Sequence, residues 1–379
     1  MLRKMIRTVI VAACSVLALV ANAQEKKEIK VGVCLPLSGA LAAYGKSTLE
    51  GIKMRVEEIN QAGGVNGVQL KLLVEDNMGD SNKAIDTYNK LAGSDGVVAV
   101  LGPITSTCAL SVRRAATKLK VPVIAPTATN DKVTKDHGFM FRACFNDSFQ
   151  GTVIANFAIK DAKKAATLID LNSDYSKGLA KSFAEAFVKN GGKMVAEEKY
   201  QQKDTDFSTQ LRKVKESGAE VLFVPGYVPE LPLIIKQTKA VGVPAKLCGA
   251  DGWDNNETIN GSGDNIEGSH IVGAFSVEDA RPPVKAFLDA WNKRTNGGRP
   301  GTFEALGYDS ASLAAEALKS GGTPDAVVKG LFAIKDFEAV SGTITIDKGG
   351  DAIKSAVILK IVKEGDKFTT KYVTTIAPK

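Results

Sequence analysis

VVAVLGPITSTCALSVRRAATKL, residues 97–119, places an apolar run, a hydroxyl-rich turn and a helical pattern in direct succession. The stretch predicts a strand, a short turn and a helix, with Thr105, Ser106 and Thr107 at the junction. Two interpretations of these hydroxyls remain open. One is helix capping, because Ser and Thr accept hydrogen bonds from the N–H groups of a first turn. The other is an anion site, because a helix N-terminus offers unpaired donors and a partial positive charge.

The same succession recurs along most of the chain. Strand-like runs alternate with helical patterns up to FMFRACFND at 139–147, and the alternation restarts at AATLIDL, residues 165–171. A helical block at 281–332 and three further strand-like runs follow. Alternating strands and helices predict parallel sheets covered by helices. Because 379 residues exceed what one hydrophobic core usually serves, we expect an α/β fold of two doubly wound, Rossmann-like lobes.

The N-terminus has the features of a secretory signal peptide. A basic start precedes an apolar segment at about 8–20 and the cleavage signal Ala21-Asn22-Ala23, which predicts removal of residues 1–23 and export. A competing interpretation takes residues 11–14 as a lipoprotein box, with Cys14 lipidated. No later apolar run approaches the ~20 residues of a membrane helix.

Charge and motif content disfavour several classes of function. The formal charge of +7 loses three positive charges with the signal peptide, and the mild excess that remains is scattered, so no nucleic-acid partner is expected. The two histidines, His137 and His270, have no ligand-spaced neighbours, so no metal is expected. No nucleophile elbow or Walker loop is present. The sequence therefore predicts neither an enzyme nor a cofactor.

Four cysteines follow the signal peptide, and most lie in or beside strand-like runs where a thiol is usually a small buried residue. Their spacing does not identify a disulfide. They are Cys34, Cys108, Cys144 and Cys248.

Two neighbouring strands end in hydroxyl-rich segments. GPITSTC follows one strand, and APTATND, residues 125–131, follows the next. Ligands of doubly wound sheets bind outside the carboxyl ends of the strands, whereas capping needs only one residue per helix. The pair of segments therefore favours a ligand site over capping alone.

Seven segments fall in the order seen in periplasmic branched-chain amino-acid binding proteins, which the chain resembles over nearly all of its mature length. They are SGALAAYGKSTLEGIKMRVEEINQAGGVNG, LGPITSTC, APTATND, DYSKGLA, GYVPE, GADGWDN and LGYDSASLAAEAL. The resemblance implies a type I periplasmic binding protein, in which two lobes joined by three hinge strands close on one amino acid.

The implied lobes are residues 24–146 plus 275–344 and residues 147–274 plus 345–379. The implied protein is a periplasmic monomer that binds an amino acid, with leucine, isoleucine or valine expected, and passes it to the membrane permease of an ABC importer. An alternative keeps the fold and changes the ligand to an amide or aromatic acid, bound by an importer or sensor component.

Residue roles also follow from the resemblance. Ser106 resembles the serine that holds the ligand carboxylate, and Thr129 the threonine that contacts carboxylate and ammonium. Thr127 matches a position that uses its backbone, while Tyr227 and Asp251 match positions facing the ammonium. The remaining implied contacts are aromatic residues that close over the ligand and residues near its side chain: Tyr44, Tyr175 and Tyr308, with Ile104 and Thr105.

Departures from the family leave some alternatives open. The positions of the family's disulfide are filled by Thr105 and a residue near Met78, and Asp251 stands where the best-known members carry Glu. Asp251 could instead belong to a turn or a cap, and Tyr44 and Tyr175 could be surface tyrosines. Trp253 is expected in the cleft or at its rim rather than in the core.

Overall fold

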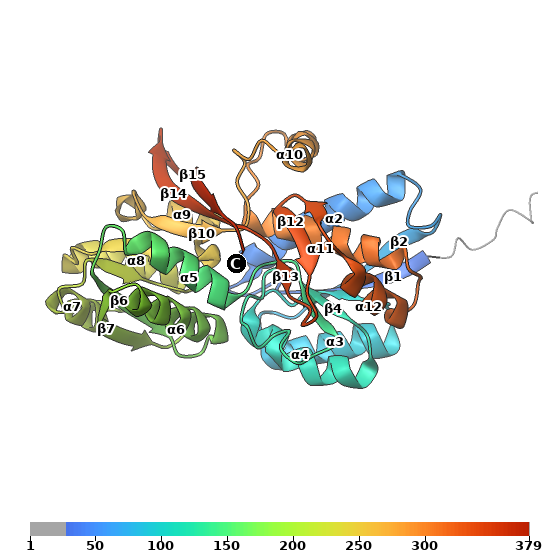
Figure 1. The fold of residues 1–379 in the computed structure, drawn as a ribbon, viewed down its shortest axis with the longest axis horizontal. Coiled ribbons are helices and arrows are strands. Elements are labelled where there is room, and N and C mark those ends of the chain that lie inside the picture. Colours follow the sequence, from blue (N-terminus) through green and yellow to red (C-terminus); the bar gives the residue numbers. More distant parts are fainter. Residues whose placement is uncertain (1–27, 379) are drawn as a thin grey trace, which may run out of the picture.

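Two separate sheets organise the chain, and each has helices packed around it (Figure 1). The computed structural model describes residues 28–378, so the signal peptide and Cys14 lie outside the described residues. The first sheet has five parallel strands in the order β2-β1-β3-β4-β5. Its strands are β1 (Glu28–Leu35), β2 (Gln69–Asp76), β3 (Val100–Leu101), β4 (Val123–Ala125) and β5 (Met140–Arg142).

The second sheet has seven strands in the order β15-β14-β10-β9-β8-β6-β7. The five strands from β10 to β7 run parallel, whereas β14 and β15 form an antiparallel edge. The strands are β6 (Lys164–Asp170), β7 (Lys193–Tyr200), β8 (Val221–Phe223), β9 (Lys246–Gly249), β10 (His270–Gly273), β14 (Ala356–Glu364) and β15 (Lys367–Ile376). The expected α/β fold is confirmed.

A small antiparallel sheet of β11 (Phe337–Ala339), β12 (Gly342–Ile346) and β13 (Ala352–Ile353) completes the strands. Within residues 28–378 no helix combines the length and apolar character that crossing a bilayer requires. The helices are α2 (Ala42–Gln61), α3 (Ser81–Asn89), α4 (Ser106–Leu119), α5 (Asp147–Ala158), α6 (Asp174–Lys189), α7 (Ser208–Glu216), α8 (Glu230–Val241), α9 (Asn256–Gly261), α10 (Pro282–Thr295), α11 (Thr302–Leu318) and α12 (Pro324–Ala333).

Side-chain caps begin the helices that matter for the site. Thr105 caps α4, Asn146 caps α5 and Ser173 caps α6, each by accepting a hydrogen bond from a first-turn N–H. All three helices start just after the carboxyl end of a strand. Their N-termini therefore lie at the edges where the sheets offer a ligand site.

Helices α2 and α11 pack unusually closely because each has a glycine facing the other. A Cβ on Gly51 would come within 2.0 Å of the Glu304 carbonyl oxygen, and one on Gly307 within 2.2 Å of the Thr48 carbonyl oxygen. Only glycine permits such backbone contact. The packing brings Phe303 of α11 against Tyr44 of α2, with ring centroids 4.7 Å apart.

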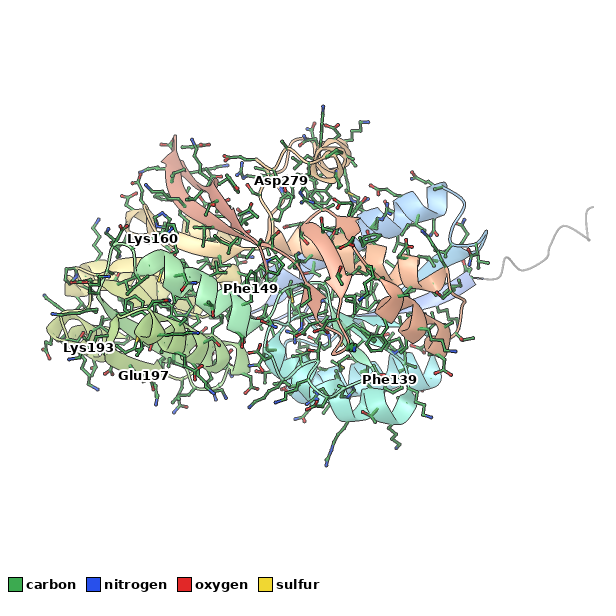
Figure 2. The ribbon with its side chains drawn as sticks, in the orientation of Figure 1. Phe139, Phe149, Lys160, Lys193, Glu197 and Asp279 are labelled. Atoms are coloured by element: carbon green, nitrogen blue, oxygen red, sulfur yellow. The ribbon has the colours of Figure 1, made fainter. Side chains whose placement is uncertain are left out.

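The chain passes between the two large sheets three times: from β5 to α5, from β10 to α10, and from β13 to β14. Phe149, in the first turn of α5, lies where the two halves meet (Figure 2). We call the halves the N-terminal and C-terminal lobes after their sheets. The lobe boundaries after residues 146, 274 and 344 remain a proposal. Strand β12 continues to Ile346, which favours placing the third boundary later than residue 344.

All four cysteines of the described chain are free and buried. Cys34 lies in β1, Cys248 lies in β9, and Cys144 follows β5. The expectation that these thiols are small core residues is confirmed.

A fully buried guanidinium anchors the segment 125–134. Arg142 Nη1 donates to the Ala128 carbonyl oxygen, and Nη2 donates to the Asn130 carbonyl oxygen and to Thr134 Oγ1. Arg142 Nε lies 2.8 Å from Asp351 Oδ1. Because Asp351 precedes the third passage, one side chain joins the hydroxyl-rich segment to the chain between the lobes.

We expect Arg142→Met to lower the free energy of unfolding by about 3 to 5 kcal/mol, because it leaves Asp351 without its buried partner. Arg142→Lys should recover only part of this loss, because an ammonium cannot reproduce the forked donors of the guanidinium. Urea unfolding would measure both, with exposed Arg212→Met as the control. Equal stability of the methionine and control variants would contradict the assigned role.

Candidate functional site

The three hydroxyls at the start of α4 do three different things. Thr105 Oγ1 accepts from the Cys108 N–H at 3.4 Å and caps the helix. Ser106 Oγ accepts from the Asn130 N–H at 3.1 Å. Thr107 Oγ1 accepts from the Asp174 N–H at 3.1 Å, across to the C-terminal lobe. Capping therefore explains only one of the three, and the other two join α4 to its surroundings.

The segment after β4 lies directly against the start of α4. Thr127 Oγ1 donates to the Ile104 carbonyl oxygen at 2.9 Å. Thr129 is completely buried, and its hydroxyl lies beside the carboxyl group of Asp147. The structure therefore brings together five of the predicted residues at two adjacent strand ends: Ile104, Thr105, Ser106, Thr127 and Thr129.

A second cluster, of tyrosines, lies at the lobe junction. The Tyr175 and Tyr227 rings stack at 4.6 Å, and Tyr44 meets Tyr227 edge-on at 5.6 Å. Tyr44 and Tyr175 are each 1% exposed, which excludes the surface interpretation. Tyr44 also reaches from α2 into the other lobe, donating to the Gly252 carbonyl oxygen at 2.9 Å and accepting from the Val228 N–H at 3.1 Å.

Asp251 is a buried acid at the carboxyl end of β9. Its Oδ1 accepts from the Tyr175 hydroxyl at 2.8 Å, and its side chain caps no helix, whereas Asn255 caps α9. Burial raises the pKa of Asp251 to about 6, although Tyr175 and Gln150 oppose this shift. No salt bridge joins Asp251 to a cation within residues 28–378, so its charge is available to a cationic group of a ligand.

The first turn of α5 connects the two clusters. The Asp147 N–H donates to the Thr129 carbonyl oxygen at 2.8 Å, and Gln150 Oε1 accepts from the Asp251 N–H at 2.8 Å. Sequence reasoning missed both Asp147 and Gln150. No sequence signal identifies them, because an acid in the first turn of a helix is common and the burial of Asp147 appears only in the structure.

Several direct hydrogen bonds join the lobes around this site. The Asp174 N–H donates to Thr107 Oγ1, and the Asp174 carbonyl oxygen accepts from the Asn130 side-chain amide. On the far side, the Thr302 N–H donates to Asp254 Oδ2. The lobes therefore meet on both sides of Tyr44, which encloses the candidate site.

Tyr308 does not join the site, contrary to the prediction. Its hydroxyl donates to Glu58 Oε2 at 2.6 Å, and the Arg55 guanidinium lies over its ring. Tyr308 follows Phe303 by five positions on α11, and with about 3.6 residues per turn it faces another direction. Phe303 supplies the aromatic contact to Tyr44 instead.

The expectation for Trp253 was also wrong. Its side chain is fully buried in the core of the C-terminal lobe, and Nε1 donates to the Val224 carbonyl oxygen at 2.7 Å. The indole fits beneath Gly249, where a Cβ would collide with its ring. Proximity to Asp251 in sequence misled the prediction, because successive residues of a tight turn face opposite ways.

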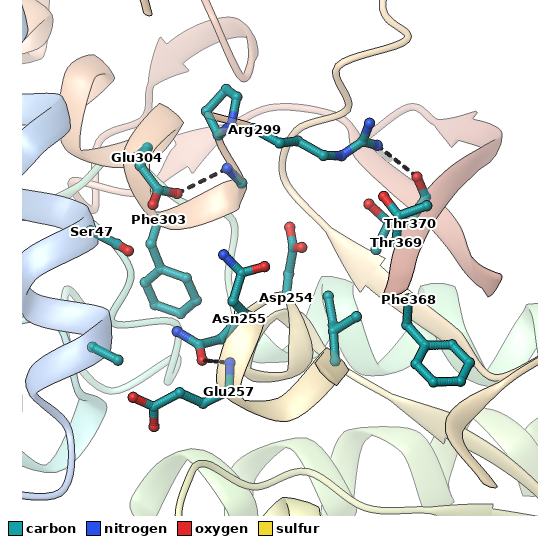
Figure 3. Close-up of a pocket in the computed structure, with 15 residues that line it drawn as sticks. Ser47, Asp254, Asn255, Glu257, Arg299, Phe303, Glu304, Phe368, Thr369 and Thr370 are labelled. Atoms are coloured by element: carbon teal, nitrogen blue, oxygen red, sulfur yellow. Dashed lines mark hydrogen bonds between the residues drawn. The ribbon is translucent and has the colours of Figure 1, made fainter. Parts of the chain in front are cut away.

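A cavity of about 290 Å³ lies between the lobes beyond Phe303 (Figure 3). Ser47 lines it from the N-terminal lobe, and Asp254 and Asn255 line it from the C-terminal lobe. Arg299 spans the two lobes beside it by donating to the Thr370 carbonyl oxygen at 2.7 Å. Since Phe303 packs on Tyr44, this cavity adjoins the tyrosine cluster but contains none of the predicted anchors.

Comparisons with known proteins agree with this architecture. A family model described as "Periplasmic binding protein" matches residues 28–366. A Leu/Ile/Val-binding protein homolog of Brucella melitensis is 31% identical over 329 residues, which span 86% of this chain and 88% of that protein. A leucine-, isoleucine-, valine-, threonine- and alanine-binding protein of Pseudomonas aeruginosa is 29% identical, covering 90% and 91% of the two chains.

Solved structures give the same likeness. A branched-chain amino-acid transporter substrate-binding protein of Streptococcus pneumoniae, in complex with isoleucine, superposes with a TM-score of 0.84 at 35% identity, covering 92% of this chain and 99% of that one. A leucine-binding protein of Thermotoga maritima gives 0.86 at 29% identity, with the same coverage.

We expect Asp251→Asn to raise the thermal unfolding midpoint of the ligand-free protein at neutral pH, because it removes a buried carboxylate. The raised pKa means that the folded protein binds more protons than the unfolded one up to about pH 6, so wild-type stability falls as pH rises through that window. The gain should therefore shrink as the solution is acidified below pH 6. Calorimetric scans across this range would measure it. Surface Asp264→Asn, which loses an ion pair with Lys363, should show no gain, and a loss of stability in Asp251→Asn at neutral pH would contradict the argument.

Proposed function

Because this chain belongs to the periplasmic binding protein family, we propose that it captures an aliphatic, branched-chain L-amino acid between its two lobes and delivers it to the permease of an ABC importer. The observation that carries the proposal is the pairing of unlike anchors. Hydroxyls and a helix N-terminus of the N-terminal lobe lie opposite a buried acid, Asp251, of the C-terminal lobe. A carboxylate suits the first and an ammonium suits the second.

The charges of an amino acid explain why both anchors are needed. A zwitterion that leaves water must have each charge matched, since burial of an unmatched charge is costly. Ser106 and the first N–H groups of α4 suit the ligand carboxylate, and Thr129 lies within the same cluster. Asp251, a buried acid without a cationic partner within residues 28–378, suits the ammonium.

Placing the two anchors on different lobes couples binding to closure. Only the closed arrangement offers both anchors at once, so a ligand that contacts both favours that arrangement. Tyr44 adds direct hydrogen bonds to Gly252 and Val228 of the facing lobe. We infer that these contacts lower the cost of closure and lengthen the lifetime of the complex.

The ligands of relatives support the choice of an aliphatic side chain. The Pseudomonas protein is named for binding leucine, isoleucine, valine, threonine and alanine, and the Brucella protein is named a Leu/Ile/Val-binding protein homolog. The Streptococcus structure contains isoleucine. Tyrosine rings and Phe303 provide apolar surface around the site. Leucine, isoleucine and valine differ by about one methylene, worth only ~1 to 3 kcal/mol in a pocket.

The proposed function also includes a cellular location and an oligomeric state. We infer that residues 1–23 direct export to the periplasm, where the protein acts as a monomer and as a binding protein rather than an enzyme. The match to a periplasmic binding protein family supports the periplasm and the binding role.

An aromatic acid is the second candidate ligand. A solute-binding protein of Rhodopseudomonas palustris in complex with 3,4-dihydroxybenzoic acid superposes with a TM-score of 0.83 at 25% identity. The stacked Tyr175 and Tyr227 rings would suit an aromatic ligand. Asp251 disfavours it, because an acid without an ammonium leaves that buried carboxyl unmatched.

Calorimetric titration of residues 24–379 with the twenty amino acids and with benzoic acids would test the proposal. We expect binding of leucine, isoleucine or valine, and no binding of benzoic acids. Ser106→Ala and Asp251→Ala should each weaken amino-acid binding by about 1.5 to 3 kcal/mol, the usual value of a hydrogen bond to a charged group. If the protein binds benzoic acids and no amino acid, the proposed ligand is wrong and an aromatic acid takes its place.

We expect Tyr44→Phe to weaken binding of the same amino acid by about 1 to 3 kcal/mol, because the closed form loses two hydrogen bonds worth ~0.5 to 1.5 kcal/mol each. The loss should fall mainly on the dissociation rate, which stopped-flow displacement measures. Tyr308→Phe is the matched control, since Tyr308 lies away from the site. Equal effects of the two substitutions would contradict the role of Tyr44.

A further inference from the structure

Basic side chains line the edge of the C-terminal sheet that lies opposite the candidate site. Four of its five parallel strands, β6, β7, β9 and β10, begin with a basic residue: Lys164, Lys193, Lys246 and His270. No strand of the five-stranded N-terminal sheet does so, and its strands begin with Glu28, Gln69, Val100, Val123 and Met140. Because parallel strands begin at the same edge of a sheet, the basic residues form a row that the N-terminal lobe lacks.

Three further lysines extend this row. Lys160 and Lys163 lie on the turn between α5 and β6, and Lys360 of β14 pairs in register with the first residue of β10. We call the whole set the basic edge: Lys160, Lys163, Lys164, Lys193, Lys246, His270 and Lys360. All six lysines are exposed. Figure 2 shows Lys160 and Lys193 on the outer part of the C-terminal lobe, away from Phe149 at the lobe junction.

Two neighbouring acids do not balance these lysines. Asp161 lies 4.0 Å from Lys246, with both side chains more than two-thirds exposed, and this is the only ion pair of the basic edge within residues 28–378. Glu220 Oε2 accepts from the backbone N–H groups of Lys163 and Lys164. Six lysines therefore face two acids, and positive charge dominates this edge.

His270 responds to the positive charge of its neighbours. Burial lowers its pKa, and Lys360 and Lys246 lower it further, whereas Asp161 opposes the shift. Two register pairs also place basic residues side by side: Lys164 with Lys193, and His270 with Lys360. Adjacent strands are only about 4.8 Å apart, and like charges opposite each other destabilise a sheet. The lobe thus keeps a row of charges that folding alone disfavours.

The shape and chemistry of the basic edge suit an extended anionic surface. The row crosses six neighbouring strands, from β7 to β14, which corresponds to roughly 24 Å. None of its residues lines one of the five best-defined cavities within residues 28–378, so it does not enclose a small anion. It contains no arginine, whose fork binds a single phosphate in bidentate fashion, whereas lysine acts as a compact point charge. Attraction to a charged surface needs only such point charges.

We propose that the basic edge binds the protein to the anionic phospholipid surface of a membrane. This inference rests on the proposed function, because a periplasmic binding protein that delivers its ligand to a permease works beside a membrane. Each lysine near an anionic bilayer adds an attraction that falls off within a Debye length. The phosphate groups of the lipids supply the negative charges that Asp161 and Glu220 do not.

Binding through this edge leaves the candidate site open. Strand β6 runs from Lys164 at the basic edge to Asp170 at the opposite edge, a length of about 20 Å. Asp251 follows the end of β9 at that opposite edge. An amino acid can therefore enter or leave the site while the protein is held at the membrane. Confinement to the surface raises the effective concentration of the protein beside the permease.

Sedimentation with lipid vesicles tests the proposal. We expect residues 24–379 to bind vesicles that contain about 30% phosphatidylglycerol at ~20 mM salt, and not to bind pure phosphatidylcholine vesicles. The affinity should fall by about tenfold or more at ~300 mM salt, because the screening length shortens. Titration with L-leucine should give the same affinity with and without the vesicles, because the site lies at the other edge of the sheet.

A matched pair of variants locates the interaction. The first variant removes lysines that form no ion pair within residues 28–378: Lys163→Gln, Lys164→Gln, Lys193→Gln and Lys360→Gln. Its affinity for phosphatidylglycerol vesicles should be lower than that of wild type by about tenfold or more. The control removes the same net charge from exposed lysines of the N-terminal lobe: Lys118→Gln, Lys285→Gln, Lys293→Gln and Lys329→Gln. The control should bind these vesicles within about twofold of wild type, because its charges lie beyond the screening length.

Thermal unfolding checks that both variants fold, and both should bind L-leucine as wild type does. Unchanged vesicle binding in the first variant would overturn the proposal. An equal loss in the two variants also contradicts it, because net charge alone then explains the binding. So does a wild-type protein that ignores anionic vesicles at low salt, and binding of polyglutamate instead would identify an acidic protein as the partner. Failure to bind any of the twenty amino acids would overturn the proposed function, which is a separate readout because the vesicle measurement uses no amino acid.

Discussion

The buried guanidinium of Arg142 is the interaction on which the geometry of the site depends. It gathers three partners of the segment after β4 and an acid beside the third passage between the lobes. A guanidinium without these partners would not tolerate full burial, so the segment and the passage must both be in place. The segment that carries Thr127 and Thr129 is thereby held against the start of α4. The backbone that carries the ligand anchors of the N-terminal lobe is consequently fixed in position.

A second constraint is the contact of α2 with α11 through two facing glycines. The contact brings Tyr44 and Phe303 together at the mouth of the site, and Tyr44 then reaches the backbone of the other lobe. The first turn of α5 completes the arrangement by touching Thr129 on one side and Asp251 on the other. The site is therefore a junction of segments from both sheets, each positioned by packing outside it.

The site also has a cost in stability. Asp147 and Asp251 are both buried acids with raised pKa values. A core built for stability alone would replace these groups with apolar side chains. Their retention at one place fits a binding protein, because a ligand that supplies the missing donors recovers part of the cost when it binds.

The sequence by itself determined the features that depend on neighbouring residues. Periodicity identified the alternating strands and helices, and the strand-end hydroxyls identified one half of the site, since carboxyl ends of parallel strands share an edge. Only the tertiary structure decided which distant side chains meet. It placed Tyr308 against Arg55, buried Trp253 in the core, and brought Asp147 to Thr129 and Gln150 to Asp251. The physical reason is that helix periodicity and capping act within a few residues, whereas the facing of a side chain and the pairing of a buried charge depend on how whole elements pack.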